Sequence, residues 1–399
     1  MTELSAVHDL DPIDELAYRA TGHYVTGANP DRLAGIFKGV ARRLKGESMN
    51  KVYSGNMIRN TEALNHWHKQ MPTEPALEPD LPIIDAHHHL WDIPALANQY
   101  LLNDLLADIG QGHYIIATVY VEAHAMYRRE GPEHMKPVGE VEFANGVASM
   151  AASGNYGNCK VANAIVAHAD LMLGSQVEEV LAKQSEVAGG RLRGIRYVTP
   201  FDDSELRNFV MRPVPPHRLA DPKFREGFRK MAAMGLVFDA WVYHPQLEDV
   251  LNLARAFPET TIVLDHAGTP LGVGPYQNDT AQTFKNWALG LRALAQCPNV
   301  VVKVGGFGMP ITGLWLHERP IPTSSIELAD SLKPYVETCI EKFGPDRCMF
   351  ESNFPVDKQA YGYSTVWNAF KRLTSHLTLE ERSNMFSRNA ARVYQGLSA

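Results

Sequence analysis

Three consecutive histidines, His87, His88 and His89, close a short β-rich segment that begins at Ile83. Because side chains alternate across a strand, His87 and His89 share one face with Asp85, whereas His88 points to the other face. Two imidazoles on one face can bind the same ion, since a neutral imidazole nitrogen is a common zinc ligand. The segment therefore predicts a metal-binding or acid–base site at a strand end, with a polar strand end of no function as the alternative.

Further polar side chains follow other predicted strands. Glu122 and His124 share one face after segment 114–121, where they could bind metal or substrate or form a structural ion pair. Asp239 and Trp241 point inward in segment 236–243, because the residues that alternate with them are apolar. We expect all four side chains to line a site.

Two cations in strand-like segments require partners. Lys303 is the only charge in segment 300–304, and a buried lysine there needs an anion, either a protein carboxylate or a substrate oxygen. Arg196 lies near the end of segment 192–198 and could grip a substrate carboxylate with two donors or form a structural pair. Both residues predict a buried or bound carboxylate nearby.

Four more candidates follow the later strands. His244 comes directly after segment 236–243, and His266 follows segment 261–265; we expect both to line the site. Glu351 ends the last predicted strand and shares a face with Asn353, two residues further on. Glu351 could be a base or a ligand, whereas Asn353 cannot take a proton and can only offer its carbonyl oxygen to a donor or a metal.

These candidates need a scaffold that brings the ends of strands together. From residue 81 onward, strand-like and helical segments alternate, with helix starts marked by Asp221-Pro222 and by a capping box at Thr378. This order predicts an α/β fold, a (β/α)8 TIM barrel, in which catalytic groups gather at the C-terminal ends of the strands. An open doubly wound sheet is the alternative, but Gly306-Phe307-Gly308 lacks the third glycine of a dinucleotide-binding loop. The predicted strands are 83–87, 114–121, 161–167, 192–198, 236–243, 261–265, 300–304 and 348–351.

Residues 1–80 predict a helical N-terminal extension, and residues 81–399 the barrel. Asp11-Pro12 and Asn29-Pro30 each place proline at the first position of a helix. A proline-rich stretch that ends at Pro82 predicts a linker. The aromatic and histidine residues of the extension, such as Tyr53 and Trp67, favour a lid over the barrel, with a homo-oligomer contact as the alternative.

Composition narrows the function. The 399 residues include 16 histidines and carry a net charge of −7, so no basic surface predicts nucleic acid or anionic lipid as a partner. No apolar run approaches the roughly 18 residues of a membrane span. The four cysteines form no C-x-x-C pair and no secretory signal is visible, so we expect a reducing, cytoplasmic location. Serine-hydrolase, P-loop and zincin motifs are absent.

In this order, the motifs resemble those of the amidohydrolase superfamily. The resemblance is strongest to its branch of TIM-barrel hydrolases that includes sugar-acid lactonases and the pyrone-dicarboxylate lactonase, and it spans about residues 81–395. Beside the histidine segment, it rests on Gly194-Ile195-Arg196-Tyr197, Asp221-Pro222-Lys223-Phe224-Arg225, His244-Pro245-Gln246-Leu247, Leu264-Asp265-His266 and Asn389-Ala390-Ala391-Arg392-Val393-Tyr394.

The resemblance implies hydrolysis of a cyclic ester. One divalent metal, zinc or manganese, would be bound by His87, His89 and His266, although the branch also contains members that work without metal. Relatives usually carry aspartate where this chain has Asn353, so Glu351 is expected to replace it as the base, ahead of Asp357 and Glu122. The expected catalytic residues are His87, His89, His244, His266, Glu351 and Asn353.

The leading prediction is a lactonase acting on a small, oxygen-rich or carboxylated ring that carries negative charge. Two alternatives remain open at this point. One is a metal-dependent decarboxylase of a small unsaturated or aromatic acid, and the other is a barrel that binds a ligand but has lost turnover. The expected substrate-binding residues are Glu122, His124, Arg196, Asp239, Trp241 and Lys303.

Overall fold

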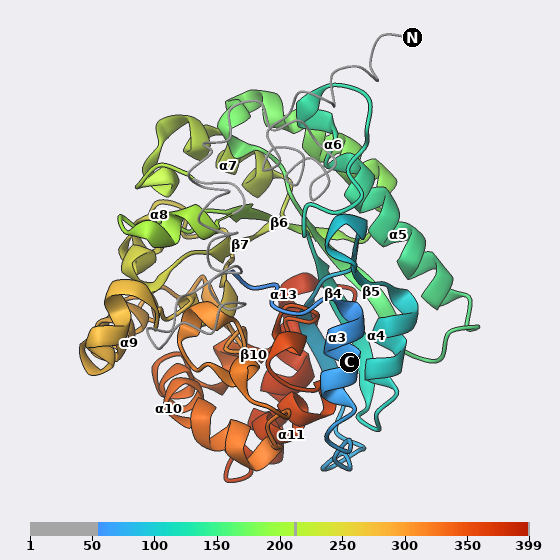
Figure 1. Ribbon diagram of the computed structural model, residues 1–399. Coiled ribbons are helices and arrows are strands. Elements are labelled where there is room, and N and C mark those ends of the chain that lie inside the picture. Colours follow the sequence, from blue (N-terminus) through green and yellow to red (C-terminus); the bar gives the residue numbers. More distant parts are fainter. Residues whose placement is uncertain (1–54, 211–213, 398–399) are drawn as a thin grey trace, which may run out of the picture.

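Eight parallel strands form a ring in the computed structural model, which describes residues 55–210 and 214–397 (Figure 1). Each strand pairs with the next one along the chain, the order that defines a barrel and not a doubly wound sheet. The strands are β1 (Ile83–His88), β4 (Ile115–Val121), β5 (Lys160–Ala167), β6 (Leu192–Val198), β7 (Val237–Trp241), β8 (Ile262–Leu264), β9 (Val300–Val304) and β10 (Cys348–Phe350).

The ring closes between β1 and the segment that follows β10. The Asn353 backbone nitrogen donates to the His87 carbonyl at 2.9 Å, and the His89 nitrogen donates to the Phe354 carbonyl at 2.7 Å. His88 and Phe354 form an isolated parallel bridge. The predicted TIM barrel and its eight strands are therefore confirmed, with strand ends that differ by no more than two residues from the prediction.

Helices follow the strands and surround the ring (Figure 1). The predicted start of α7 is confirmed, since the Asp221 side chain accepts from the Lys223 nitrogen. The capping box at Thr378 is confirmed as well. The helices of the barrel are α4 (Leu102–Ile109), α5 (Val138–Ala152), α6 (Val177–Val187), α7 (Pro222–Ala233), α8 (Leu247–Ala256), α9 (Thr280–Leu294), α10 (Ser325–Phe343), α11 (Tyr363–Leu373), α12 (Leu379–Ser383) and α13 (Asn389–Tyr394).

A small antiparallel hairpin follows β1 and was not predicted. It consists of β2 (Trp91–Ile93) and β3 (Asn98–Tyr100), and the Trp91 indole nitrogen donates to the Asn98 side chain at 2.7 Å. Its strands of three residues are too short to show a pattern of alternation in the sequence.

The described part of the extension lies against the barrel. Helix α3 (Thr61–His68) begins at Asn60, whose side chain accepts from the Ala63 nitrogen at 2.9 Å. The proline-rich stretch that was predicted as a linker is held by α11, since Lys371 donates to the Leu77 carbonyl at 2.7 Å. The predicted helices at Asp11 and Asn29 lie outside the described residues, and the domain boundary at residue 80 stays a prediction.

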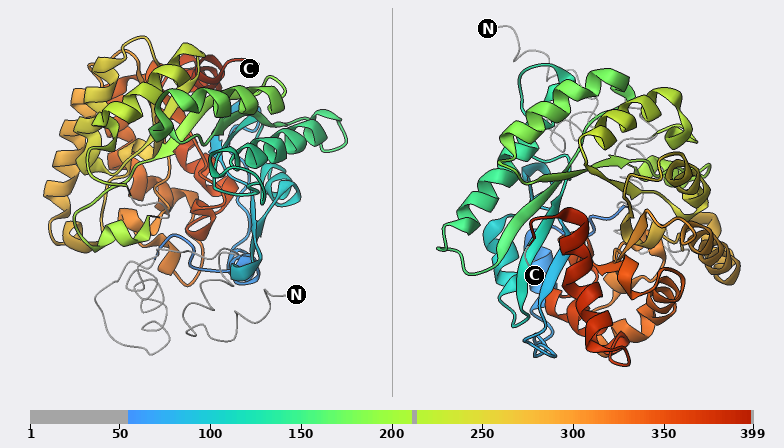
Figure 2. Two further views of the ribbon diagram at one scale, coloured as in Figure 1. Left: turned by 90° about the horizontal axis from the view of Figure 1, so that it is seen from above. Right: turned by 180° about the vertical axis from the view of Figure 1, so that it is seen from behind.

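The barrel has two apolar layers, one between strands and helices and one inside the ring. The inner layer contains Ile84, Val263 and Val301 near the N-terminal ends of their strands, and Tyr394 of α13 packs against it. In the view from behind, the red C-terminal helices lie nearer to the viewer than the strands (Figure 2, right). We call this end the floor and the opposite end, where the strands terminate, the mouth. None of the described helices is long and apolar enough to cross a membrane.

Candidate active site

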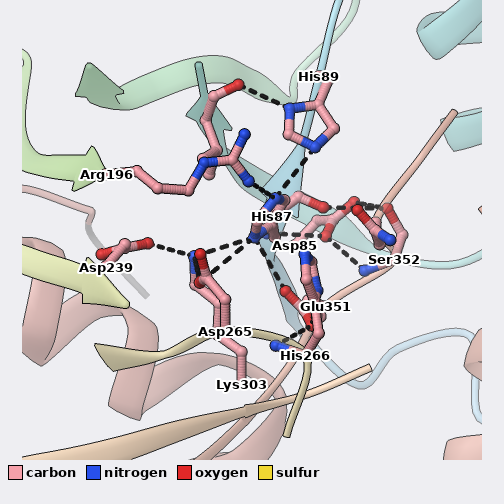
Figure 3. A network of polar contacts seen from close by, with 12 residues as sticks. Asp85, His87, His89, Arg196, Asp239, Asp265, His266, Lys303, Glu351 and Ser352 are labelled. Atoms are coloured by element: carbon pink, nitrogen blue, oxygen red, sulfur yellow. Dashed lines mark hydrogen bonds and ion pairs between the residues drawn. The ribbon is translucent and has the colours of Figure 1, made fainter. Parts of the chain in front are cut away.

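His87 stands at the centre of a buried polar network at the mouth end of the strands (Figure 3). Its Nδ1 lies 3.0 Å from Glu351 Oε2, 3.2 Å from Lys303 Nζ and 3.6 Å from Asp265 Oδ1. Its Nε2 lies 3.1 Å from His89 Nε2. Side chains of β1, of β9 and of the segments after β8 and β10 thus meet at one imidazole, as the barrel geometry predicts.

Glu351 connects the two histidines that can bind a metal. Its Oε1 lies 2.8 Å from His266 Nδ1 and accepts from the His266 backbone nitrogen at 3.2 Å. His87, His266 and Glu351 each offer one ligand atom within 4.8 Å of the others, and all three are buried. The group differs from the expected set in one member, because Glu351 takes the place of His89.

His89 is instead hydrogen-bonded to the backbone of a neighbouring strand. Its Nδ1 donates to the Val121 carbonyl at 2.8 Å, so its Nε2 carries the lone pair that faces His87. Burial, together with the charge of Arg196, lowers the pKa of His89 well below its ordinary value. His89 is therefore a neutral hydrogen-bond acceptor that orients His87.

Asp265 is a member of the network that the sequence analysis did not select. It directly precedes His266, and strict alternation would send the two side chains to opposite faces. His266 has a left-handed backbone (φ 54°) within the turn Asp265–Gly268, so both side chains reach the centre. Asp265 Oδ1 lies 3.1 Å from Lys303 Nζ, while neither of its oxygens accepts a hydrogen bond from the described residues.

Lys303 has the anionic partners that its position requires, and they are protein carboxylates. Its Nζ donates to Asp239 Oδ2 at 2.6 Å and lies 3.1 Å from Asp265 Oδ1. Burial favours the neutral amine, but Asp239 and Asp265 outweigh it and raise the pKa of Lys303. The side chain is therefore a permanent buried cation.

Arg196 is likewise paired inside the protein. Its Nε donates to Glu122 Oε1 at 2.7 Å, and its Nη2 donates to the Glu122 carbonyl. Burial opposes ionisation of Glu122, but Arg196 outweighs it and holds the pKa of Glu122 below its usual range. The guanidinium lies 5.4 Å from the centroid of the Trp241 ring. Arg196 thus holds Glu122 with two donors, one on the carboxylate and one on the backbone carbonyl, so the expected two-donor grip on a substrate carboxylate is not what the structure shows.

Two histidines lie next to this ion pair. His124 Nδ1 lies 2.9 Å from the Tyr127 hydroxyl and 3.3 Å from Glu122 Oε2. The His168 ring lies 5.3 Å from that of His124, and its Nδ1 lies 3.4 Å from the Arg196 carbonyl. His168 directly follows β5 and was missed, although a histidine at the end of a barrel strand is the signal that selected the others.

Asn353 lies beside the network and contacts a different acid. It has a left-handed backbone (φ 54°), and its Nδ2 donates to Asp357 Oδ1 at 3.0 Å. Asp357 also accepts from the Gly308 nitrogen and the Tyr361 hydroxyl. Burial raises the pKa of Asp357 to about 7 despite these donors. Because three donors hold Asp357, it is less suited than Asp265 to accept a proton from water.

His244 lies apart from the network. Its Nδ1 accepts from the Leu271 nitrogen at 3.2 Å, and its ring contacts Tyr276 edge-on at 5.1 Å. Burial lowers the pKa of His244 to about 4. Of the expected catalytic residues, the structure thus brings together His87, His89, His266 and Glu351, while Asn353 and His244 contact other residues.

Asp85 holds segments of the chain together beside the network. Its carboxylate accepts from the Ser352 hydroxyl at 2.6 Å, the Ser352 nitrogen at 2.9 Å and the Tyr363 hydroxyl at 2.9 Å. These bonds join β1 to the segment after β10, next to Glu351. His88 points to the outer face, as predicted, where its Nε2 lies 2.8 Å from the Thr118 hydroxyl.

The network contains more buried acids than buried cations. Five carboxyl groups are fully buried, whereas only Lys303 and Arg196 supply permanent positive charge. Burial, reinforced by Lys303, lowers the pKa of His87 well below its ordinary value, so this imidazole is neutral. Buried charges require compensation, so the network can accommodate a further cation or additional protons. The five acids are Asp85, Glu122, Asp239, Asp265 and Glu351.

The barrel and its imidazole–carboxylate centre define a TIM-barrel protein with a candidate metal site at the mouth. The sequence model described as amidohydrolase matches residues 84–396, and the chain belongs to this family. Protein y4mH of Sinorhizobium fredii is 32% identical over 79% of this chain and 99% of its own length. The L-fucono-1,5-lactonase of Burkholderia multivorans is 28% identical over 78% of this chain and 95% of its own length. The crystal structure of a zinc-bound amidohydrolase from the same species has a TM-score of 0.59 and 28% identity, and covers 78% of this chain and 98% of its own.

Proposed function

We propose that this chain is a lactonase that opens a small, oxygen-rich or carboxylated cyclic ester with the help of one divalent metal ion. The proposal is supported by the similar L-fucono-1,5-lactonase and by the zinc in the similar solved structure. The observation that carries it is the buried group His87, His266 and Glu351 within a network that has more buried carboxyl groups than permanent cations.

The donor atoms of this group fit a zinc ion. His89 Nε2 at one side and Lys303 Nζ at the other favour a neutral His87 with its proton on Nε2 and its lone pair at Nδ1. The longer contact of 3.4 Å between Arg196 Nη1 and His87 Nε2 opposes this assignment. The lone pair at Nδ1 faces Glu351 Oε2 at 3.0 Å, an oxygen that accepts no hydrogen bond from the described residues. Lys303 Nζ lies 3.2 Å from the same Nδ1, but Glu351 Oε2 has no donor in the part of the chain that the structure describes, and a metal ion would supply the cation that this oxygen lacks. Two imidazoles and one carboxylate are a common ligand set of catalytic zinc.

The protein groups then have separate roles. When bound, the metal would polarise the ring carbonyl of the ester. Asp265 Oδ2, which accepts no hydrogen bond from the described residues, takes the proton of the attacking water and returns it to the ring oxygen as the ester C–O bond breaks. Lys303 stays charged and lies 3.1 Å from Asp265 Oδ1, where it can keep the carboxylate in place. In this scheme, Glu351 is a ligand and Asp265 is the base, which revises the expectation that Glu351 replaces the missing aspartate.

The substrate approaches over the outer part of the network. Arg196 and Trp241 lie on one side, and His124 and His168 lie next to Arg196. The Arg196 donors are largely occupied by Glu122, so its charge attracts an anionic substrate more than it forms direct hydrogen bonds. We further propose that the chain is located in the cytoplasm and that it forms a homo-oligomer.

The test uses protein purified without chelator. We expect about one zinc or manganese per chain and release of acid from 1,4- or 1,5-lactones of sugar acids, with both lost in His266→Gln. His217→Gln, which changes an exposed histidine paired with Asp249, is the control and keeps both. Release of CO2 from aromatic acids without lactone turnover would show a decarboxylase. Stabilisation by lactones without any turnover would show a binding protein.

A further inference from the structure

The last helix of the chain places a tyrosine under the active site. Helix α13 begins at Asn389, whose side chain donates to the carbonyls of Pro345 and Cys348 at 2.7 Å each, next to the start of β10. Five residues later, Tyr394 is fully buried within the inner apolar layer at the floor of the barrel. Figure 1 shows α13 within the outline of the ring of strands. The hydroxyl of Tyr394 therefore enters the barrel from the end opposite to the mouth.

This hydroxyl contacts the acid that holds Lys303. The Tyr394 hydroxyl lies 2.9 Å from Asp239 Oδ2 and 3.1 Å from Asp239 Oδ1, and Lys303 Nζ lies 2.6 Å from the same Oδ2. Lys303 Nζ also lies 5.3 Å from the centroid of the Tyr394 ring. Among the described residues, Tyr394 and Lys303 are the donors to the Asp239 carboxylate. The Tyr394 hydroxyl is therefore one of the two donors that orient the Asp239 carboxylate.

Lys303 passes this orientation on to the reacting centre. Besides Asp239, its ammonium contacts His87 Nδ1 at 3.2 Å and Asp265 Oδ1 at 3.1 Å. The ammonium group thus donates to Asp239 and contacts His87 Nδ1, and it forms an ion pair with Asp265. A buried charge held in this way moves only when one of its partners moves.

We propose that Tyr394 is a positioning residue of the active site, which acts through Asp239 to hold the Lys303 ammonium against His87 and Asp265. This inference rests on the proposed function and extends the site to the end of the chain. Loss of the hydroxyl leaves the buried Asp239 with one donor and frees its carboxylate to rotate. Lys303 then shifts, and a displacement of this kind beside the reacting atoms lowers kcat more than it changes KM.

The same chain contains a matched control. At the β2–β3 hairpin, the Tyr100 hydroxyl donates to Asp108 Oδ2 at 2.7 Å, and Lys358 Nζ lies 2.6 Å from the same oxygen. Lys358 lies 5.1 Å from the centroid of the Tyr100 ring. This repeats the tyrosine–aspartate–lysine arrangement, but none of its members contacts His87 or Asp265 in the described structure.

The experiment compares Tyr394→Phe with Tyr100→Phe in the full-length protein. Each variant loses one buried hydroxyl, so we expect similar decreases in Tm. Only Tyr394→Phe should lower kcat for the lactone, by about 10- to 100-fold, with KM within about twofold of wild type. In protein labelled with 15N-histidine, the ring signals of His87, assigned with His87→Gln, should move in Tyr394→Phe and stay in place in Tyr100→Phe.

A double variant tests the route through Asp239. If Tyr394 acts through that carboxylate, Tyr394→Phe adds nothing to the displacement of the His87 signals that Asp239→Asn already causes. The proposal is overturned if Tyr394→Phe matches Tyr100→Phe in kcat and in the His87 signals, or if the two displacements simply add. A wild-type protein without lactone turnover would refute the proposed function alone, because the His87 signals still report on Tyr394.

Discussion

Glu351 Oε1 accepts two hydrogen bonds from His266, one from the ring Nδ1 at 2.8 Å and one from the backbone nitrogen at 3.2 Å. The second oxygen of Glu351 faces His87 at 3.0 Å. One carboxylate thus joins a histidine of β1 to one that follows β8, and it fixes the His266 proton on Nδ1. The lone pair of His266 is left at Nε2, where it is available to a metal.

Glu351→Gln should remove the metal and the activity together. The glutamine amide is neutral and brings two N–H donors into a group that needs negative charge and lone pairs. We expect bound zinc to fall to a trace and kcat/KM to fall by at least about 100-fold. Metal analysis and kinetics on the same sample measure both. Full zinc content in the variant would contradict the assignment of Glu351 as a ligand.

Asp265→Asn should separate turnover from metal binding. In the proposed scheme, Asp265 accepts the proton of water but is not a ligand, so the variant keeps its zinc. We expect kcat to fall by about 100- to 10,000-fold, the range for loss of a general base. If the variant loses zinc as Glu351→Gln does, Asp265 is a ligand and the base lies elsewhere.

The strands could be predicted because their signals are local. Short apolar segments, caps such as Asp221 and capping boxes such as that of Thr378 need only neighbouring residues to be recognised. Inward-facing residues on regular strands, such as His87 and Lys303, were found for the same reason.

The rest depended on backbone turns and on partners far along the chain. Asp265 was missed because the left-handed His266 breaks the alternation that selects residues by face. The partner of Arg196 is Glu122, 74 residues away, and nothing at either position shows that the two meet. His244 begins a short turn three residues after the end of β7, where alternation no longer predicts a direction. Such contacts are set by the packing of the whole barrel.

Asn353→Asp should destabilise the protein most at alkaline pH. The new carboxylate would lie against Asp357, whose pKa burial already raises to about 7. The folded protein keeps the Asp357 proton that the unfolded chain releases above about pH 4, so stability falls as the pH rises through this window. A second buried carboxylate extends the fall above pH 7, to a loss of about 3 kcal/mol.

Urea unfolding at pH 5.5 and pH 8.5 measures this effect. The control is Asn384→Asp, in which a half-buried asparagine donates to the exposed Asp346 at 2.7 Å in the same manner. Solvent screens that pair, so we expect little change at either pH. Equal losses for Asn353→Asp at the two pH values would show that the new acid is not coupled to Asp357.

His113 should contribute to unfolding in acid. Burial, reinforced by Lys371, lowers the pKa of His113 to about 4. Between pH 6.5 and 4, the unfolded chain takes up a proton that the folded protein does not, so stability falls as the pH falls. The full change is up to about 3 kcal/mol. Between pH 7 and pH 4.5, His113→Gln should lose less free energy of unfolding than wild type, by up to this amount. The control His66→Gln, at an exposed position, should match wild type. Parallel acid unfolding curves for His113→Gln and wild type would contradict the assignment.

Trp67 should control how firmly the extension is held near the mouth. It is 4% exposed, its indole nitrogen donates to the Arg319 carbonyl at 3.0 Å, and the Arg59 guanidinium lies 4.4 Å from its ring. Arg59 in turn donates to the carbonyls of His317 and Gln359, in the loops that follow β9 and β10. These are loops of the mouth, so the described part of the extension lies where a lid would.

Trp67→Ala removes a large packed side chain, a change that typically costs about 3 to 5 kcal/mol. We expect segment 55–70 to become sensitive to protease and KM for the lactone to rise severalfold while kcat stays within about twofold. Met57→Ala, at an exposed position of the same segment, is the control and should change neither. If Trp67→Ala becomes sensitive to protease but keeps its KM, the extension is held by these contacts without acting as a lid, and its role lies in stability or assembly.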